Sequence, residues 1–113
     1  MIQAKFFRGG DGSLHMRLEG HAGAGPKGQD LVCAAASGLA CTLGSTVERL
    51  YEQGMLRRVP KVELYAGGAE IIAVPKPTFS REGAMVFWTV QNGIAELADS
   101  FPGNVKLTET MRV

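Results

Sequence analysis

His21 and Cys33 are the two residues of this chain whose types best suit covalent chemistry. A cysteine thiolate attacks carbonyl carbon, and a neighbouring imidazole can stabilise the thiolate and then protonate the leaving amine. Cys33 falls three residues after Asp30, the expected N-cap of a long helix, where the helix dipole and free backbone N–H groups stabilise a thiolate. The same N–H groups would serve as an oxyanion hole. These residues predict a Cys–His pair, provided that the glycine-rich loop between them folds back.

Structural roles compete with this interpretation. Cysteine is among the most buried residue types, and a histidine beside a glycine is more often an ordinary loop residue. Ser37, one turn after Cys33, is expected to hydrogen-bond to its own helix backbone and, alternatively, to contact a substrate. Cys41 lies eight residues after Cys33, about 12 Å along a helix, which is too far for a disulfide bond. We expect Cys41 to pack as a small apolar residue.

The loop between His21 and Cys33 carries a rival motif. Residues 23–28, Gly-Ala-Gly-Pro-Lys-Gly, match the G-x-G-x-x-G pattern of phosphate-binding loops. However, the preceding strand alternates between apolar and polar residues, and the order of elements is ββα, whereas a dinucleotide site needs βαβ. A phosphate- or nucleotide-binding module is therefore kept as an alternative function.

The elements that must position these residues follow from periodicity. Apolar and alternating segments between turn residues predict strands at 2–8, 13–19, 61–65, 71–74 and 105–113, the last at an edge of the sheet. Apolar residues at steps of three and four predict helices at 31–53 and 80–101. Met85 and Trp88 lie beside the apolar stripe of the second helix, and we expect them to be buried. The order ββαββαβ predicts an α+β two-layer sandwich, with two helices packed on one face of a mainly antiparallel sheet.

Composition narrows the class of protein. A chain of 113 residues is expected to form one domain, 1–113. Its formal net charge of +1 gives no electrostatic basis for binding nucleic acid, and no apolar run approaches the roughly 20 residues of a membrane span. Two cysteines are too few for a disulfide scaffold, so the cytoplasm is the expected compartment. No metal or cofactor is expected.

Two segments of the chain together resemble a known signature. Gly20-His21-Ala22, followed after a short loop by Asp-Leu-Val-Cys-Ala-Ala-Ala-Ser at 30–37, is similar to the signature of the Prp family, the ribosomal-processing cysteine proteases. The likeness in length and order of elements extends over essentially the whole chain. The resemblance implies an endopeptidase that removes the N-terminal extension of large-subunit ribosomal protein twenty-seven, cutting after a Phe-Phe pair and before Ala.

The resemblance also implies roles for individual residues. It places the catalytic histidine at His21 and the nucleophile at Cys33, and it matches Asp30 and Ser37 to supporting positions. It implies a homodimer without a cofactor. The substrate loop that it implies consists of Ala22, Gly23, Ala24, Gly25, Pro26, Lys27, Gly28 and Gln29.

The function that we predict is a cytoplasmic cysteine endopeptidase with a Cys33–His21 dyad. Cys33 would attack the scissile carbonyl, His21 would move the proton, and water would hydrolyse the acyl-thioester. The alternatives are the phosphate- or nucleotide-binding module and a non-catalytic dimer associated with the ribosome.

Overall fold

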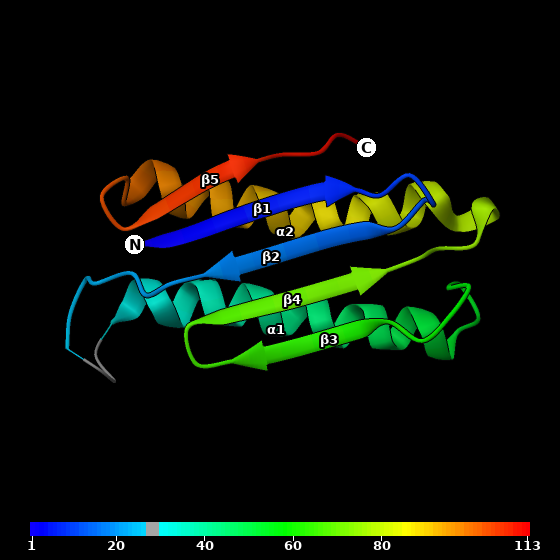
Figure 1. Cartoon of the computed structure of the whole chain (residues 1–113), viewed down its shortest axis with the longest axis horizontal. Helices are drawn as coiled ribbons and strands as arrows, with labels where there is room; N and C mark the ends of the chain where they lie inside the picture. Colours follow the sequence, from blue (N-terminus) through cyan, green and yellow to red (C-terminus); the bar gives the residue numbers. More distant parts are fainter. Residues whose placement is uncertain (27–29) are drawn as a thin grey trace.

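In the part of the chain that the structure describes, seven main elements follow one another in the predicted order ββαββαβ (Figure 1). The computed structural model describes residues 1–26 and 30–113. Its elements are β1 (Ile2–Arg8), β2 (Leu14–Glu19), α1 (Leu31–Glu52), β3 (Lys61–Tyr65), β4 (Gly68–Ala73), α2 (Ser80–Ser100) and β5 (Val105–Glu109), with a short 3-10 turn, Pro77–Phe79, before α2. Both predicted helices and all five predicted strands are therefore present.

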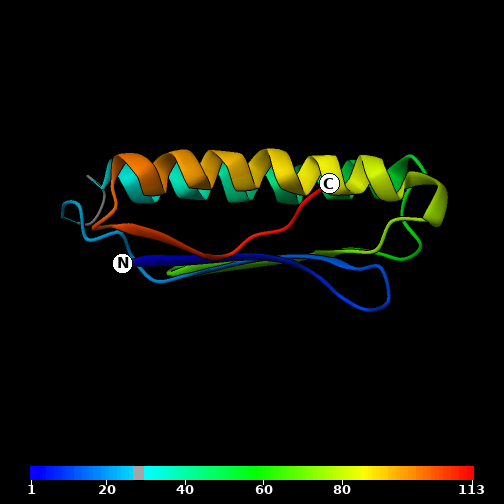
Figure 2. The same cartoon turned by 90° about the horizontal axis from the view of Figure 1, so that it is seen from above.

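The strands form one sheet in the order β3-β4-β2-β1-β5. The β1–β5 pair is parallel, and the other three pairs are antiparallel. Figure 2 shows both helices on one face of this sheet, with the other face uncovered. The predicted α+β two-layer sandwich is confirmed, and β5 lies at one edge as expected, with β3 at the other.

Strand alternation explains which face of the sheet is covered. Along β1, β2 and β4, every second residue is buried, because these side chains point toward the helices. The helices turn apolar stripes toward these side chains. The largest fully buried side chains come from both layers: Phe6, Phe87, Leu14, Met16, Leu43, Ile71, Ile94, Val47, Val74 and Val105. The core therefore lies between the sheet and the two helices.

Helix α1 packs closely on the β3 side of the sheet. Gly44 faces β3, and a Cβ atom built on it would lie only 2.8 Å from Cγ1 of Val62. A larger residue at this position would push helix and strand apart. After α1, Gly54 adopts a φ of 76°, which is a favourable conformation for glycine and ends the helix where the sequence predicted. These contacts fix the distance between α1 and the edge strand.

The expected burial of Met85 and Trp88 is wrong. The buried stripe of α2 includes Ala84 and Phe87, and each of the two residues follows one stripe position, about 100° further around the helix. Met85 and Trp88 are 43% and 37% exposed, because no layer covers the outer side of the helices. Phe101 also leaves the predicted stripe, since it is the C-cap and is exposed.

The last strand is shorter than predicted. Pairing ends at Glu109, yet Met111 is buried. The side chain of Gln91 in α2 explains this difference: its Oε1 accepts from the Met111 N–H at 2.8 Å, and its Nε2 donates to the Met111 carbonyl at 3.1 Å. A helix side chain thus takes the place of a neighbouring strand for the terminal residues.

Helix α1 is more apolar than the lack of a 20-residue apolar run led us to expect. Its 22 residues contain a window with a mean hydropathy of 1.4, so by length and composition it passes as a membrane-spanning helix. The core helix of a soluble protein passes the same test. Here the apolar stripe of α1, which includes Val32, Leu43 and Val47, packs into the core.

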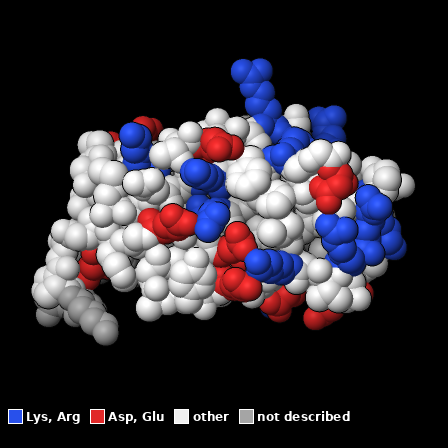
Figure 3. All heavy atoms as spheres, viewed as in Figure 1, with Lys and Arg blue, Asp and Glu red and all other residues white. Residues whose placement is uncertain are grey.

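The uncovered face of the sheet carries interspersed positive and negative side chains (Figure 3). Arg17 and Glu19 form an ion pair of 2.8 Å on this face, and Lys61 pairs with Glu70. Between the charges, the rings of Phe7 and His15 stack with centroids 4.5 Å apart. The sheet thus presents a mixed polar surface opposite the helices.

Candidate active site

Asp30 sets the start of α1 and holds the preceding loop. Its Oδ1 accepts a hydrogen bond of 2.9 Å from the N–H of Cys33, which is the capping contact that the sequence predicted. Its Oδ2 accepts from the N–H of Ala24 at 3.1 Å. These donors, above all the Cys33 N–H, lower the pKa of the Asp30 carboxyl from its ordinary value. The carboxylate therefore joins the helix start to the loop after His21.

The sulfur of Cys33 contacts the backbone of the same loop. Cys33 is half-buried in the first turn of α1, and its Sγ accepts a hydrogen bond of 3.2 Å from the N–H of Ala22. The carbonyl of Ala22 in turn accepts from Nδ2 of Asn104 at 2.8 Å. The Ala22 residue is therefore held on both sides, by the sulfur and by the turn between α2 and β5.

His21 lies next to this backbone, but its side chain turns toward the β3–β4 hairpin. A Cβ atom built on Gly67 would lie 3.0 Å from Nε2 of His21, so the imidazole rests directly on that glycine. The N–H of Gly20 also donates to the carbonyl of Gly67 at 2.8 Å. His21 is exposed, and within residues 1–26 and 30–113 no hydrogen bond joins it to Cys33.

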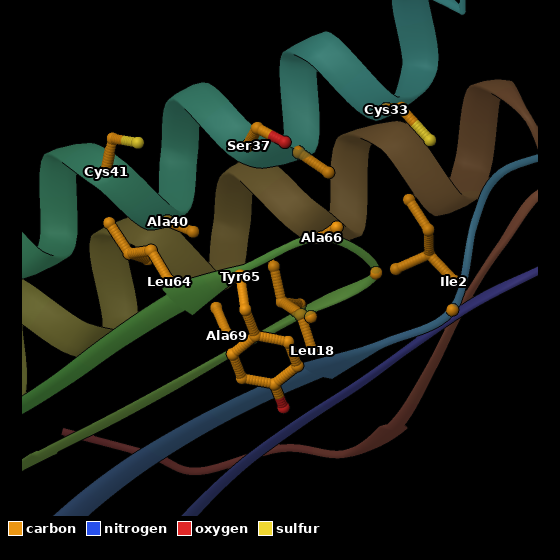
Figure 4. Close-up of a pocket in the computed structure, with 14 residues that line it drawn as sticks. Ile2, Leu18, Cys33, Ser37, Ala40, Cys41, Leu64, Tyr65, Ala66 and Ala69 are labelled. Carbon is orange, nitrogen blue, oxygen red and sulfur yellow. The ribbon is translucent and has the colours of Figure 1, made fainter. Parts of the chain in front are cut away.

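An apolar pocket of about 410 Å³ opens beside Cys33 (Figure 4). One wall is the face of α1 that carries Cys33, Ser37 and Cys41. The opposite wall comes from the sheet and the end of the β3–β4 hairpin: Ile2, Leu18, Gly20, Leu64, Tyr65, Ala66, Gly67, Gly68 and Ala69. The pocket thus begins at the sulfur and runs along α1.

The expected packing role of Cys41 is wrong. Cys41 is exposed and lines the pocket, because its position on α1 faces the gap between the helix and β3. Cys33 and Cys41 are both free thiols, as their separation of eight residues predicted. Ser37 lies between them and lines the same pocket, one helical turn beyond Cys33.

In the described part of the glycine-rich loop, residues 20–26 and 30, the structure gives no support to phosphate binding. The N–H of Cys33 at the start of α1 is already taken by the Asp30 carboxylate, whose negative charge would repel a phosphate. Gly23 has a φ of 69° and belongs to the described part of the loop. Lys27, Gly28 and Gln29, which complete the motif and the predicted substrate loop, lie outside the described residues.

The chemistry that this arrangement suits is attack on a carbonyl group bound in an apolar pocket. The sulfur lies at the pocket wall, a backbone N–H points at it, and an imidazole rests on Gly67, which also lines the pocket. Two contributors to this arrangement are not indicated by the sequence. Asn104 follows Pro-Gly and has the ordinary signature of a turn residue, and Gly67 is one of two consecutive glycines between the predicted strands. Neither position carries a local signal of a role beside Cys33.

Two of three comparisons place the chain among known proteins. The family model described as cysteine protease Prp matches residues 1–106. A crystal structure of SMU.848 from Streptococcus mutans is 31% identical, covers 99% of this chain and 96% of its own, and has a TM-score of 0.69. Among curated proteins, none matches this chain.

Two further structures, both from S. aureus, share the fold. One is an essential ribosomal processing protease Prp in complex with a covalently linked product peptide, with 21% identity, a TM-score of 0.71 and coverage of 97% of this chain and 100% of that one. The other is the same protease with a substrate peptide, with 19% identity, a TM-score of 0.61 and the same coverage. At these identities the likeness establishes the architecture.

We expect Asp30→Asn to keep one of the two hydrogen bonds of the carboxylate and to lose the other. The amide oxygen still accepts from the Cys33 N–H, whereas the amide nitrogen cannot accept from the Ala24 N–H. Asp30→Ala loses both contacts, so its melting temperature should fall further than that of Asp30→Asn.

The stabilisation by Asp30 should depend on pH. Because the pKa of Asp30 is lowered in the folded state, its contribution to the stability of the fold is complete above the ordinary aspartate range and disappears as the pH falls through the lowered pKa. Thermal melts from neutral to strongly acidic pH should show the wild type and Asp30→Asn converging only in acid; a constant difference would contradict this account.

We expect Asn104→Ala to loosen the backbone at Ala22. The substitution removes the donor to the Ala22 carbonyl, a hydrogen bond whose net contribution corresponds to roughly a fivefold change in local opening. Amide hydrogen exchange should therefore accelerate by about that factor at Ala22, while amides in the core of α2 keep their wild-type rates. Equal acceleration in both places would indicate a general loss of stability instead.

Proposed function

This chain belongs to the Prp family of cysteine proteases, and we propose that it removes the N-terminal extension of large-subunit ribosomal protein twenty-seven by cutting after a Phe-Phe pair. One observation carries the proposal: the Cys33 sulfur, held by the Ala22 N–H, lies at one end of an apolar pocket that suits aromatic side chains. The S. aureus neighbour is a ribosomal processing protease with a covalently linked product peptide, which supports the same class of substrate.

In the proposed reaction, Cys33 is the nucleophile and His21 carries the proton. The Cys33 sulfur adds to the scissile carbonyl carbon, and His21 takes the thiol proton and delivers it to the departing amine. The products of this step are the new N-terminus and an acyl-thioester on Cys33. Water, deprotonated by His21, then hydrolyses the thioester and regenerates the thiol.

The proposal requires His21 to leave its resting contact. Its imidazole packs on Gly67, which lines the same pocket as Cys33, and we propose that a rotation of the side chain, with local adjustment of the loop, brings it to the sulfur. Catalytic hydrogen bonds often shorten only when substrate is bound. We propose that the peptide displaces the imidazole from Gly67 and so assembles the dyad, a form of induced fit that limits cleavage of other proteins.

The supporting residues receive separate roles in this proposal. Asp30 fixes the start of α1 and, through Ala24, the course of the loop that leads back from His21. Ser37 offers its hydroxyl to the substrate backbone one turn beyond the sulfur. The described part of the substrate loop, Ala22 to Pro26, would close over the bound peptide.

We further propose a single protease domain, 1–113, that acts as a homodimer in the cytoplasm. The exposed pair Met85 and Trp88, three residues apart on the outer side of α2, supports an association surface, since large apolar side chains on one helix face favour burial against a partner. Cell fractionation tests the compartment.

The dyad is tested by cleavage of a peptide that spans Phe-Phe-Ala and of the full-length ribosomal protein. Cys33→Ala and His21→Ala should each lower kcat/KM by roughly a thousandfold or more, because they remove the nucleophile or the proton carrier. His15→Ala is the matched control, since His15 lies on the opposite face of the sheet, against Phe7. Mass spectrometry identifies both the cleavage products and the acyl adduct, and the adduct should map to Cys33.

Cleavage by the wild type at another peptide bond would contradict the proposed specificity but not the proposed dyad. Failure to cut either substrate would contradict the proposed function and favour the non-catalytic alternative. Thermal melts of both variants verify that lost activity does not result from unfolding.

The homodimer is tested by light scattering. The wild type should have twice the 12.0 kDa mass of one chain, and Trp88→Glu should shift the protein toward the monomer, because a charge would be buried in the interface. Tyr51→Glu, a comparable change at the exposed end of α1, is the control that should leave the mass unaltered. A wild-type monomer would contradict the proposal.

A further inference from the structure

Strand β3 is an edge of the sheet, and its end is also a wall of the Cys33 pocket. It is first in the strand order, so one side of its backbone has no neighbouring strand. Leu64 and Tyr65 at its end line the pocket together with Cys33. A peptide whose scissile carbonyl reaches the sulfur can therefore also contact the free edge of this strand.

The hairpin register shows which backbone groups point outward. Tyr65 pairs with Gly68 across a two-residue turn, and the pair that flanks such a turn exchanges both N–H···O bonds. Pairs then alternate along the hairpin. The N–H and C=O groups of Glu63 and Tyr65 thus point at β4, whereas those of Val62 and Leu64 point away from the sheet.

We propose that the substrate segment before the scissile bond binds as an added strand on the free edge of β3, using the outward backbone groups of Leu64 and Val62. This inference rests on the proposed proteolytic function. Addition of a strand to an exposed edge is a general mode of peptide recognition, in which backbone bonds supply affinity and alternate side chains supply specificity. Cys33 and Cys41 are about 12 Å apart along α1, the length of roughly three to four extended residues, which matches a short strand.

The two faces of β3 explain why a pair of aromatic residues would be recognised. Leu64 points toward α1 and the pocket, whereas the ring of Tyr65 extends to the other side of the strand, over Gly68 (Figure 4). Consecutive side chains of an added strand also alternate between faces. One phenylalanine of the Phe-Phe pair enters the pocket beside Leu64, and the other lies against Tyr65, which is 53% exposed.

An N-methyl scan of the substrate tests the added strand on the unaltered enzyme. Each backbone amide before the scissile bond is methylated in turn, and kcat/KM is measured for each peptide. Every second methyl group should lower kcat/KM by roughly tenfold, because only alternate amides face β3, and the peptides between them should be cleaved at close to the parent rate. A flat or non-alternating profile with a well-cleaved parent peptide overturns the added strand but not the protease.

Leu64→Pro and Leu64→Ala test the enzyme side. Both remove the leucine side chain, but only proline removes the outward N–H, and proline is tolerated on edge strands where that group faces solvent. Leu64→Pro should lower kcat/KM by a further two- to tenfold relative to Leu64→Ala. Equal activity of the two folded variants overturns the proposed bond. If Leu64→Pro does not fold, the N-methyl scan alone tests the added strand.

A double-mutant cycle tests the division between the faces. Tyr65→Ala should weaken cleavage of the parent peptide by roughly two- to fivefold, and it should have no further effect on a peptide in which the phenylalanine facing Tyr65 is alanine. Replacing the other phenylalanine should leave the effect of Tyr65→Ala intact. Effects that simply add at both positions overturn this assignment. A dimer that dissociates in Leu64→Pro would show that β3 pairs with a second copy of the chain, and that result overturns the added substrate strand. An uncleaved parent peptide overturns both this inference and the proposed function.

Discussion

The carboxylate of Asp30 at the start of α1 is the contact on which the site depends. By accepting the N–H of Cys33, it decides at which residue the helix begins, and therefore on which side of the helix the sulfur lies. Its other oxygen holds Ala24, so the loop after His21 cannot leave the helix start without breaking a charge-assisted hydrogen bond. One side chain thus links the position of the proposed nucleophile to the segment that carries the proposed proton carrier.

A second constraint arises where three distant parts of the chain meet at Ala22. Its N–H points at the Cys33 sulfur, and its carbonyl accepts from Asn104. Two residues earlier, the N–H of Gly20 donates to the carbonyl of Gly67 in the β3–β4 turn. The helix start, the turn before β5 and the hairpin therefore share one short stretch of backbone. Movement of that stretch would alter the sulfur and the imidazole together, which suits a site that the proposed mechanism assembles on substrate binding.

The arrangement of the layers explains why the pocket lies at this end of the molecule. Gly44 allows α1 to approach β3 closely along the middle of the helix, whereas the small side chains of Ala36, Ser37 and Ala40 leave space nearer its start. Since β3 is an edge strand, that space opens to the side and is not sealed by a further strand. Tight packing at the middle of the helix and small residues nearer its start thus produce an apolar cleft beside the thiol.

Local patterns in the sequence determined the element order, the two-layer architecture, the cap at Asp30 and the separation of the two cysteines, because each depends on residues close together in the chain. Periodicity specifies how far a side chain lies around its own helix but not whether another layer covers it, so the exposure of Trp88 and Cys41 was decided by tertiary packing. Tertiary packing also decided three contacts between residues distant in sequence. These are the hydrogen bond from Asn104 to the Ala22 carbonyl, the contact of the His21 imidazole with Gly67, and the hydrogen bonds of Gln91 with the terminal segment. Such contacts carry no local signal, since they exist only after the sheet order has brought the turns and helix ends together.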